Sequence, residues 1–72
     1  MTNRKLLEKK IKESGLKLGF IAEKLGISYH WLKRKINGEV PFKAYEIKIL
    51  CDLLGITDLQ EREEIFFAEN VE

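Results

Sequence analysis

Apolar residues recur along the chain at three- and four-residue spacing, which is the periodicity of helices that bury one face. The spacing predicts five short helices, separated by glycine-containing turns and by a loop that holds the only proline. The predicted helices cover about residues 4–14, 18–25, 29–37, 43–54 and 59–68. No segment alternates between apolar and polar residues in the way of a β-strand. The sequence therefore predicts an all-α fold.

The segment LKLGFIAEKLGISYHWLKRKING, residues 16–38, is the most informative part of the chain. Gly26 ends the second predicted helix, and the hydroxyl of Ser28 is placed to cap the third. The third helix has apolar residues on one edge and aromatic, histidine and basic residues on the other. Two short helices joined by a glycine turn, here about residues 18–37, are the arrangement of a helix-turn-helix. Such a unit reads DNA by laying its second helix in the major groove.

The net charge of +1 hides a strong asymmetry along the chain. Residues 1–35 contain ten Lys or Arg and three Glu, a balance of +7, whereas residues 36–72 contain three Lys or Arg and nine Asp or Glu, a balance of −6. A basic half that contains the candidate recognition helix suits a polyanion such as DNA. The alternative is two solvated faces of opposite sign without a polyanionic partner. If DNA is the partner, the acidic half should face away from it.

Composition narrows the class of protein further. The 72 residues predict a single domain over 1–72, and 44% hydrophobic with 35% charged residues is typical of a globular chain. The one cysteine, Cys51, rules out an internal disulfide and lies on the apolar side of its predicted helix. No apolar run approaches the roughly 20 residues of a membrane span. We therefore expect a cytoplasmic protein that does not associate with membranes.

No pattern of residues predicts catalysis, a metal or a cofactor. His30 has no second histidine and no cysteine near it in the sequence, so a metal site is not expected there. Glu61, Glu63 and Glu64 have the spacing of a solvated acidic face rather than of a catalytic pair. The chain also has no glycine-rich phosphate loop. The sequence therefore predicts a binding protein and not an enzyme.

The run from Gly15 to Leu54 resembles the small helix-turn-helix domain of phage repressors of the Cro and CI kind. The C-terminal ITDLQEREEIFFAENVE is similar to the ending of small regulators from phages and prophages of Gram-positive bacteria. The resemblance implies a five-helix lambda-repressor-like DNA-binding domain. It also implies a sequence-specific transcriptional regulator of a lysis–lysogeny switch, acting at the nucleoid in the bacterial cytoplasm. The residues that carry the resemblance are Leu16, Ile21-Ala22, Lys24-Leu25-Gly26, Leu32 and Ile36-Asn37-Gly38, with ISYHWLKRKING especially close to the pattern of the group.

The resemblance also implies which residues would contact a double-stranded DNA operator. Tyr29 and His30, in the first turn of the third helix, would meet base edges. Lys33 and Arg34, one turn later, would extend that face, and Arg34 is the best placed for a bidentate contact with guanine. Backbone phosphates would be contacted by Lys17, Lys35, Asn37 and Lys43, with Lys33 also within reach of the backbone.

One position departs from the family pattern. The family usually has glutamine at the start of the second helix, where its side chain binds a phosphate, but this chain has Leu18 followed by Gly19. A leucine side chain donates no hydrogen bond. Either backbone amides take over this contact, or binding to DNA is weak, or the chain does not depend on DNA.

The C-terminal helix, about residues 58–69, carries the second feature of interest. It ends in a cluster of bulky apolar residues, Ile65, Phe66, Phe67 and Val71. Either all of them cover a thin core, or some remain exposed for a second copy of the chain or for another protein. An antirepressor or co-regulator that binds a phage repressor protein instead of DNA is therefore the alternative function. The near-neutral net charge and Leu18 favour that alternative modestly.

Overall fold

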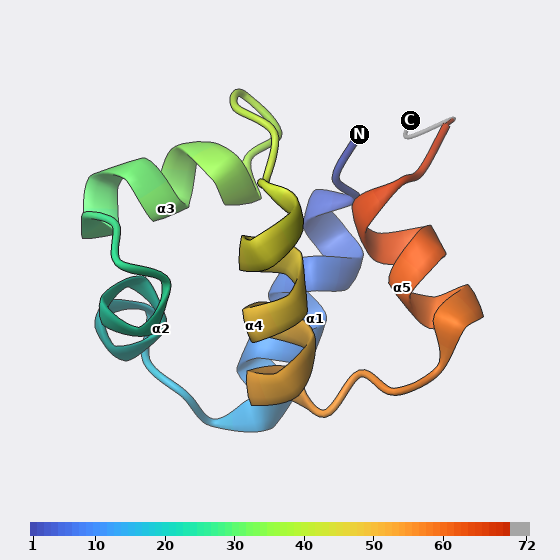
Figure 1. The fold of residues 1–72 in the computed structure, drawn as a ribbon, viewed down its shortest axis with the longest axis horizontal. Helices are drawn as coiled ribbons and strands as arrows, with labels where there is room; N and C mark the ends of the chain where they lie inside the picture. Colours follow the sequence, from blue (N-terminus) through green and yellow to red (C-terminus); the bar gives the residue numbers. More distant parts are fainter. Residues whose placement is uncertain (70–72) are drawn as a thin grey trace.

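The computed structural model describes residues 1–69, and within that part of the chain the regular structure consists of five α-helices and no strand. The helices are α1 (Arg4–Ser14), α2 (Leu18–Leu25), α3 (Tyr29–Ile36), α4 (Ala44–Leu54) and α5 (Leu59–Phe66), as Figure 1 shows. The all-α prediction is confirmed, although the last helix ends at Phe66 rather than near residue 68. None of the described helices is long and apolar enough to cross a membrane.

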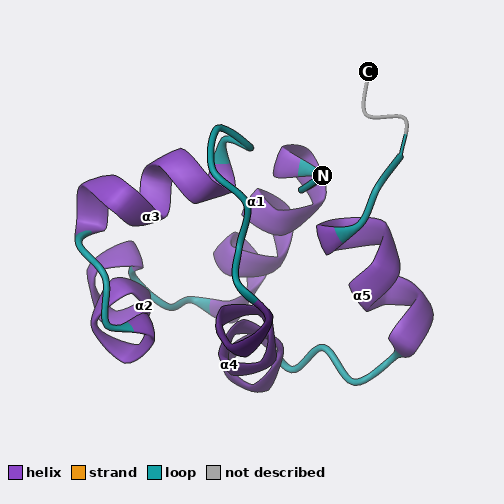
Figure 2. Cartoon of the chain, turned by 45° about the horizontal axis from the view of Figure 1, so that its top comes forward, coloured by secondary structure: helices purple, strands orange, loops and turns teal. Residues whose placement is uncertain are grey.

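Helix α4 occupies the middle of the molecule and packs against α1 and α2. Helix α3 also packs against α1 and α2, whereas α5 packs mainly against α1. In Figures 1 and 2, α2 and α3 lie on one side of α4 and α5 lies on the other. The basic α3 and the glutamate-rich α5 therefore lie on opposite sides of the molecule.

Every helix contributes apolar side chains to one core. Cys51 is 7% exposed, which confirms its predicted core position. Phe42, from the loop before α4, packs edge-on against Phe66 with 5.7 Å between the ring centroids. The buried apolar residues are Leu7, Ile11, Ile21, Ala22, Leu25, Leu32, Ile36, Ile47, Leu50, Cys51, Leu54, Ile56, Ile65 and Phe66.

The turn between α2 and α3 is fixed by local hydrogen bonds. Gly26 has a φ of 74°, a left-handed conformation that is strained for residues with a side chain, and its N–H donates to the carbonyls of Ala22 and Glu23. Two residues later, the Ser28 hydroxyl accepts a hydrogen bond of 3.0 Å from the backbone N–H of Trp31. The predicted glycine stop and serine cap are both confirmed, and together they set the direction in which α3 leaves α2.

The N-terminal segment is hydrogen-bonded to the end of α5. The backbone N–H of Asn3 donates to the carbonyl of Ile65 at 2.6 Å, and the N–H of Ala68 donates to the carbonyl of Met1 at 2.9 Å. In Figure 1 the N-terminus accordingly lies beside the last turn of α5. These bonds supplement the packing of α5 against α1 and hold that helix against the rest of the molecule.

Candidate nucleic-acid interface

Helix α3 has two faces of different character. Its inner face, defined by Leu32, Lys35 and Ile36, is buried. Its outer face carries side chains that are exposed, apart from Arg34, which is half-buried. No residue of α3 is acidic. The structure thus brings together the four predicted base contacts and one predicted phosphate contact on this outer face: Tyr29, His30, Lys33, Arg34 and Asn37.

Aromatic rings support two of the cations on this helix. The ammonium nitrogen of Lys33 lies 5.9 Å from the centre of the Tyr29 ring, and the guanidinium carbon of Arg34 lies 5.0 Å from that of Trp31. Trp31 itself is 38% exposed. A cation held over a ring keeps its hydrogen-bond donors free. The contacts therefore restrict the conformations of Lys33 and Arg34 along the helix, and both side chains can still bind an anion.

Glu39 is a further residue at this surface that the sequence did not reveal. Arg34 Nε lies 3.4 Å from Glu39 Oε1, and Asn37 Nδ2 donates to Glu39 Oε2 at 3.5 Å. The chain reverses after α3, and the backbone N–H of Glu39 donates to the carbonyl of Arg34, which brings the carboxylate back onto the helix. The carboxylate occupies donors that a phosphate or a guanine edge would use. Gly38 before Glu39 was the available signal for this reversal.

The position of Lys35 corrects one predicted phosphate contact. Lys35 is 1% exposed, and its ammonium nitrogen lies 2.5 Å from Oε1 of Glu46, which is fully buried. The same carboxylate oxygen accepts a hydrogen bond of 2.8 Å from the backbone N–H of Lys43 and so caps the start of α4. An ammonium group enclosed in this way does not reach a DNA phosphate. The prediction that Lys35 contacts the DNA backbone is therefore wrong for this structure.

The helical periodicity explains why Lys35 is buried. It follows Leu32 by three residues and precedes Ile36, so its side chain leaves the helix on the inner face. Glu46 precedes Leu50 by four residues and therefore points from α4 into the same region. The second oxygen of that carboxylate, Oε2, has no hydrogen-bond partner among the described residues. The spacing of Lys35 from Leu32 and Ile36 is a local signal for its burial, but the basic run predicts a DNA-binding surface, and nothing in the sequence indicates Glu46 as the partner.

The remaining predicted phosphate contacts lie at helix ends. Lys17 is the N-cap residue of α2 and Lys43 that of α4, and both are exposed. No side chain caps the first turn of α2. Leu18, the first residue of α2, is partly buried and packs against the core. Its side chain thus has a structural role, while the first backbone amides of α2 have no side-chain partner.

The C-terminal apolar cluster is mostly internal. Ile65 and Phe66 are 1% and 4% exposed, so neither is available as a surface for a second copy or a partner. Phe67 is 47% exposed and lines a cavity together with Met1, which is 69% exposed. Val71 lies outside the described residues. Of the cluster, the described part leaves Phe67 as the candidate partner contact.

Comparisons with protein-family models, with curated proteins and with solved structures found no match to this chain. Among the described residues, no group of three or more His, Cys, Asp or Glu side chains is placed to hold a metal ion. The outer face of α3 is the surface of the described residues where basic, amide and aromatic side chains lie together.

Proposed function

We propose that this chain is a sequence-specific DNA-binding transcriptional regulator, similar in action to a phage Cro-like repressor. The observation that carries the proposal is the outer face of α3, where basic, amide and aromatic side chains are exposed on one side of a helix whose other side is buried. In the proposal, α2 and α3 are the two helices of a helix-turn-helix, and residues 26–28 are its turn.

In the bound state, α3 lies in the major groove of a double-stranded operator. Tyr29 and His30 meet base edges from the first turn of α3, and Arg34 makes a bidentate contact with guanine, which contributes about 1–3 kcal/mol of discrimination. Lys17 and Lys43 bind phosphates on either side and set the position of the helix. To make the guanine contact, Arg34 exchanges its weak contact with Glu39 for the base.

The regulator acts by occupying its operator and excluding polymerase or a competing repressor, in the bacterial cytoplasm and at the nucleoid. A two-fold symmetric operator has half-sites about 34 Å apart, one helical turn of DNA. Such a site is occupied by a homodimer, so the proposal includes dimer formation on DNA.

The test is a selection of random duplex DNA by the purified protein at low and moderate salt, with the solution mass measured in parallel. The proposal predicts an enriched site with two-fold symmetry that persists at moderate salt. Binding that enriches no sequence and disappears with salt would contradict it, because such binding is only electrostatic.

A protein-binding role is the second candidate, favoured by apolar side chains exposed away from α3. Leu59 is 69% exposed, Tyr45 53% and Phe67 47%, and the first two line one groove between α4 and α5. An antirepressor would bind a repressor protein through this side of the molecule. It would tolerate Arg34→Ala and lose its partner on Phe67→Ala, whereas a DNA-binding regulator would show the opposite pattern.

A further inference from the structure

A cavity between α1, α2 and α3 lies next to the outer face of α3. The residues that line it include the buried or partly buried Ile11, Leu18 and Ile36 and the exposed Lys12, Lys33 and Asn37. Two lysines and one asparagine, from α1 and from α3 with its C-cap, thus line one opening that has an apolar base. Lys33 and Asn37 belong to the proposed DNA-binding surface, whereas Lys12 belongs to α1.

The charge of Lys12 is not neutralised within the described part of the chain. Glu8 also lines the cavity and precedes Lys12 by four residues, the favourable order for an ion pair on a helix. Its carboxylate, however, lies 3.4 Å from Arg4 Nε, one turn in the other direction. Neither Lys12 nor Lys33 forms an ion pair among residues 1–69.

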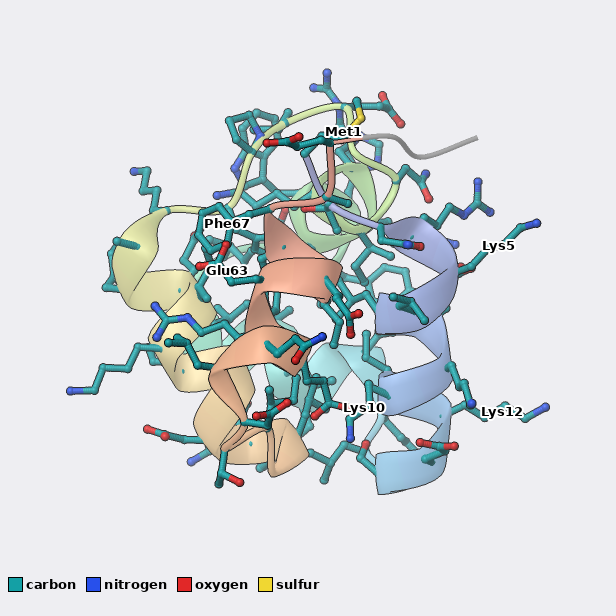
Figure 3. The ribbon with its side chains drawn as sticks, turned by 90° about the vertical axis from the view of Figure 1, so that its right-hand side faces the viewer. Met1, Lys5, Lys10, Lys12, Glu63 and Phe67 are labelled. Atoms are coloured by element: carbon teal, nitrogen blue, oxygen red, sulfur yellow. The ribbon has the colours of Figure 1, made fainter. Side chains whose placement is uncertain are left out.

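The lysines of α1 divide between two sides of the molecule. Lys10 turns toward α5, where its ammonium nitrogen lies 3.4 Å from Glu61 Oε2. Figure 3 shows Lys10 between α1 and α5, while Lys12 extends away from α5. Lys10 therefore forms an ion pair within the chain, whereas Lys12 is available to bind an anion from outside it.

We propose that Lys12 binds a phosphate of the DNA backbone at the rim of this cavity, beside the groups contacted by Lys33 and Asn37. The inference rests on the proposed DNA-binding function and extends the interface from α3 onto α1. Leu18 offers no side-chain donor at the start of α2, and Lys12 brings a charged donor to the same cavity. A lysine that contacts phosphate adds affinity without choosing a sequence.

The test compares Lys12→Gln with Lys48→Gln on the duplex selected by the wild-type protein. Both variants lose one positive charge from an exposed lysine, but Lys48 lines the groove between α4 and α5. Lys12→Gln should lower affinity about 3- to 10-fold and reduce the slope of log K against log salt by about 0.9. Lys48→Gln should change neither quantity, and Lys12→Arg should keep both near the wild-type values.

The outcomes separate this proposal from the proposed function. Wild-type binding that Arg34→Ala weakens and Lys12→Gln leaves unchanged contradicts the role of Lys12 alone. Equal losses of duplex affinity in Lys12→Gln and Lys48→Gln also contradict it, because they indicate a general effect of net charge. Absence of duplex binding by the wild-type protein contradicts both proposals. Thermal unfolding of each variant verifies that the lysine changes leave the fold intact.

Discussion

Two neighbouring basic residues, Arg34 and Lys35, lie on opposite faces of α3 and differ in burial and in the kind of ion pair they form. Arg34, on the outer face, is half-buried and meets Glu39 at 3.4 Å across a contact open to solvent. Lys35, the next residue, is 1% exposed and bound to Glu46 inside the molecule. One step along the helix turns the side chain by about 100°, so adjacent residues of one basic run belong to different environments.

The difference assigns different roles to the two ion pairs. An exposed pair contributes about 0–1 kcal/mol, so a strong external anion can displace Glu39 from Arg34. A buried pair is costly to break, because removing one partner leaves an uncompensated charge in the core. The outer face is therefore suited to binding, and the inner face to holding α3 against the start of α4.

The largest predicted effect is a loss of folding stability on substitution of Lys35, on the inner face of α3. Lys35→Ala should lower the free energy of unfolding by about 3–5 kcal/mol, because Glu46 would be left without its cation. Lys33→Ala, two residues earlier on the outer face, should change it by no more than about 0.5 kcal/mol. Urea denaturation followed by circular dichroism measures both.

A double variant tests the origin of that loss. Lys35→Met with Glu46→Leu removes both charges and should be more stable than Lys35→Met alone. Some loss relative to wild type is expected, since the carboxylate of Glu46 also accepts from the backbone N–H of Lys43. The inner-face account fails if Lys35→Ala is no more destabilising than Lys33→Ala.

The next largest effect is on DNA affinity through the outer face. Arg34→Ala should weaken binding to the selected duplex by about 1–3 kcal/mol and relax the preference for guanine at one position. Fluorescence anisotropy with the cognate duplex and with single-base variants measures both. Arg62→Ala, on α5, is the matched control and should bind as wild type does. Similar losses in the two variants would argue against a specific role of Arg34.

Removing the carboxylate of Glu39, which competes with DNA for Arg34 and Asn37, should raise affinity for DNA by a smaller amount. Glu39→Gln keeps the size of the side chain but removes the charge that occupies Arg34 and Asn37, so affinity for DNA should rise by up to about 1 kcal/mol. In the Arg34→Ala background the same change should have less effect, because the main partner of Glu39 is gone. An equal gain in both backgrounds would mean that Glu39 acts only through net charge.

The sequence predicted the helices well because their signals are local. Apolar spacing, Gly26 and Ser28 each act within one or two turns of the chain, and the structure confirms all three. The core position of Cys51 followed from the same periodicity. These features need no knowledge of how the helices pack.

The sequence failed where a side chain depends on a distant partner. Glu46 is 11 residues from Lys35, and nothing local indicates that the two side chains meet. For Ile65 the sequence left open whether the side chain covers the core or remains exposed, and in the structure it is 1% exposed. The prediction for Lys35 was wrong because it took the exposure of a basic residue from its type, without the packing that encloses the side chain.

The smallest predicted effect concerns the buried thiol of α4. Burial raises the pKa of the Cys51 thiol, against a smaller lowering by Arg62. The raised pKa contributes stability that is fully present below the ordinary value of 9.0 and is lost as pH rises through the folded value. At pH 8 a thiol reagent should therefore react more slowly with the native protein than in denaturant. Equal rates would mean that this side of α4 is open to solvent.

The most direct test of the division between the two faces is an NMR titration of the labelled protein with the selected duplex. The account predicts that the largest amide and side-chain shifts fall on the outer face of α3, from Tyr29 to Asn37, and at the starts of α2 and α4. The ammonium group of Lys35 should remain hydrogen-bonded to Glu46 throughout. Shifts centred on Phe67 and α5, with α3 unchanged, would contradict the account.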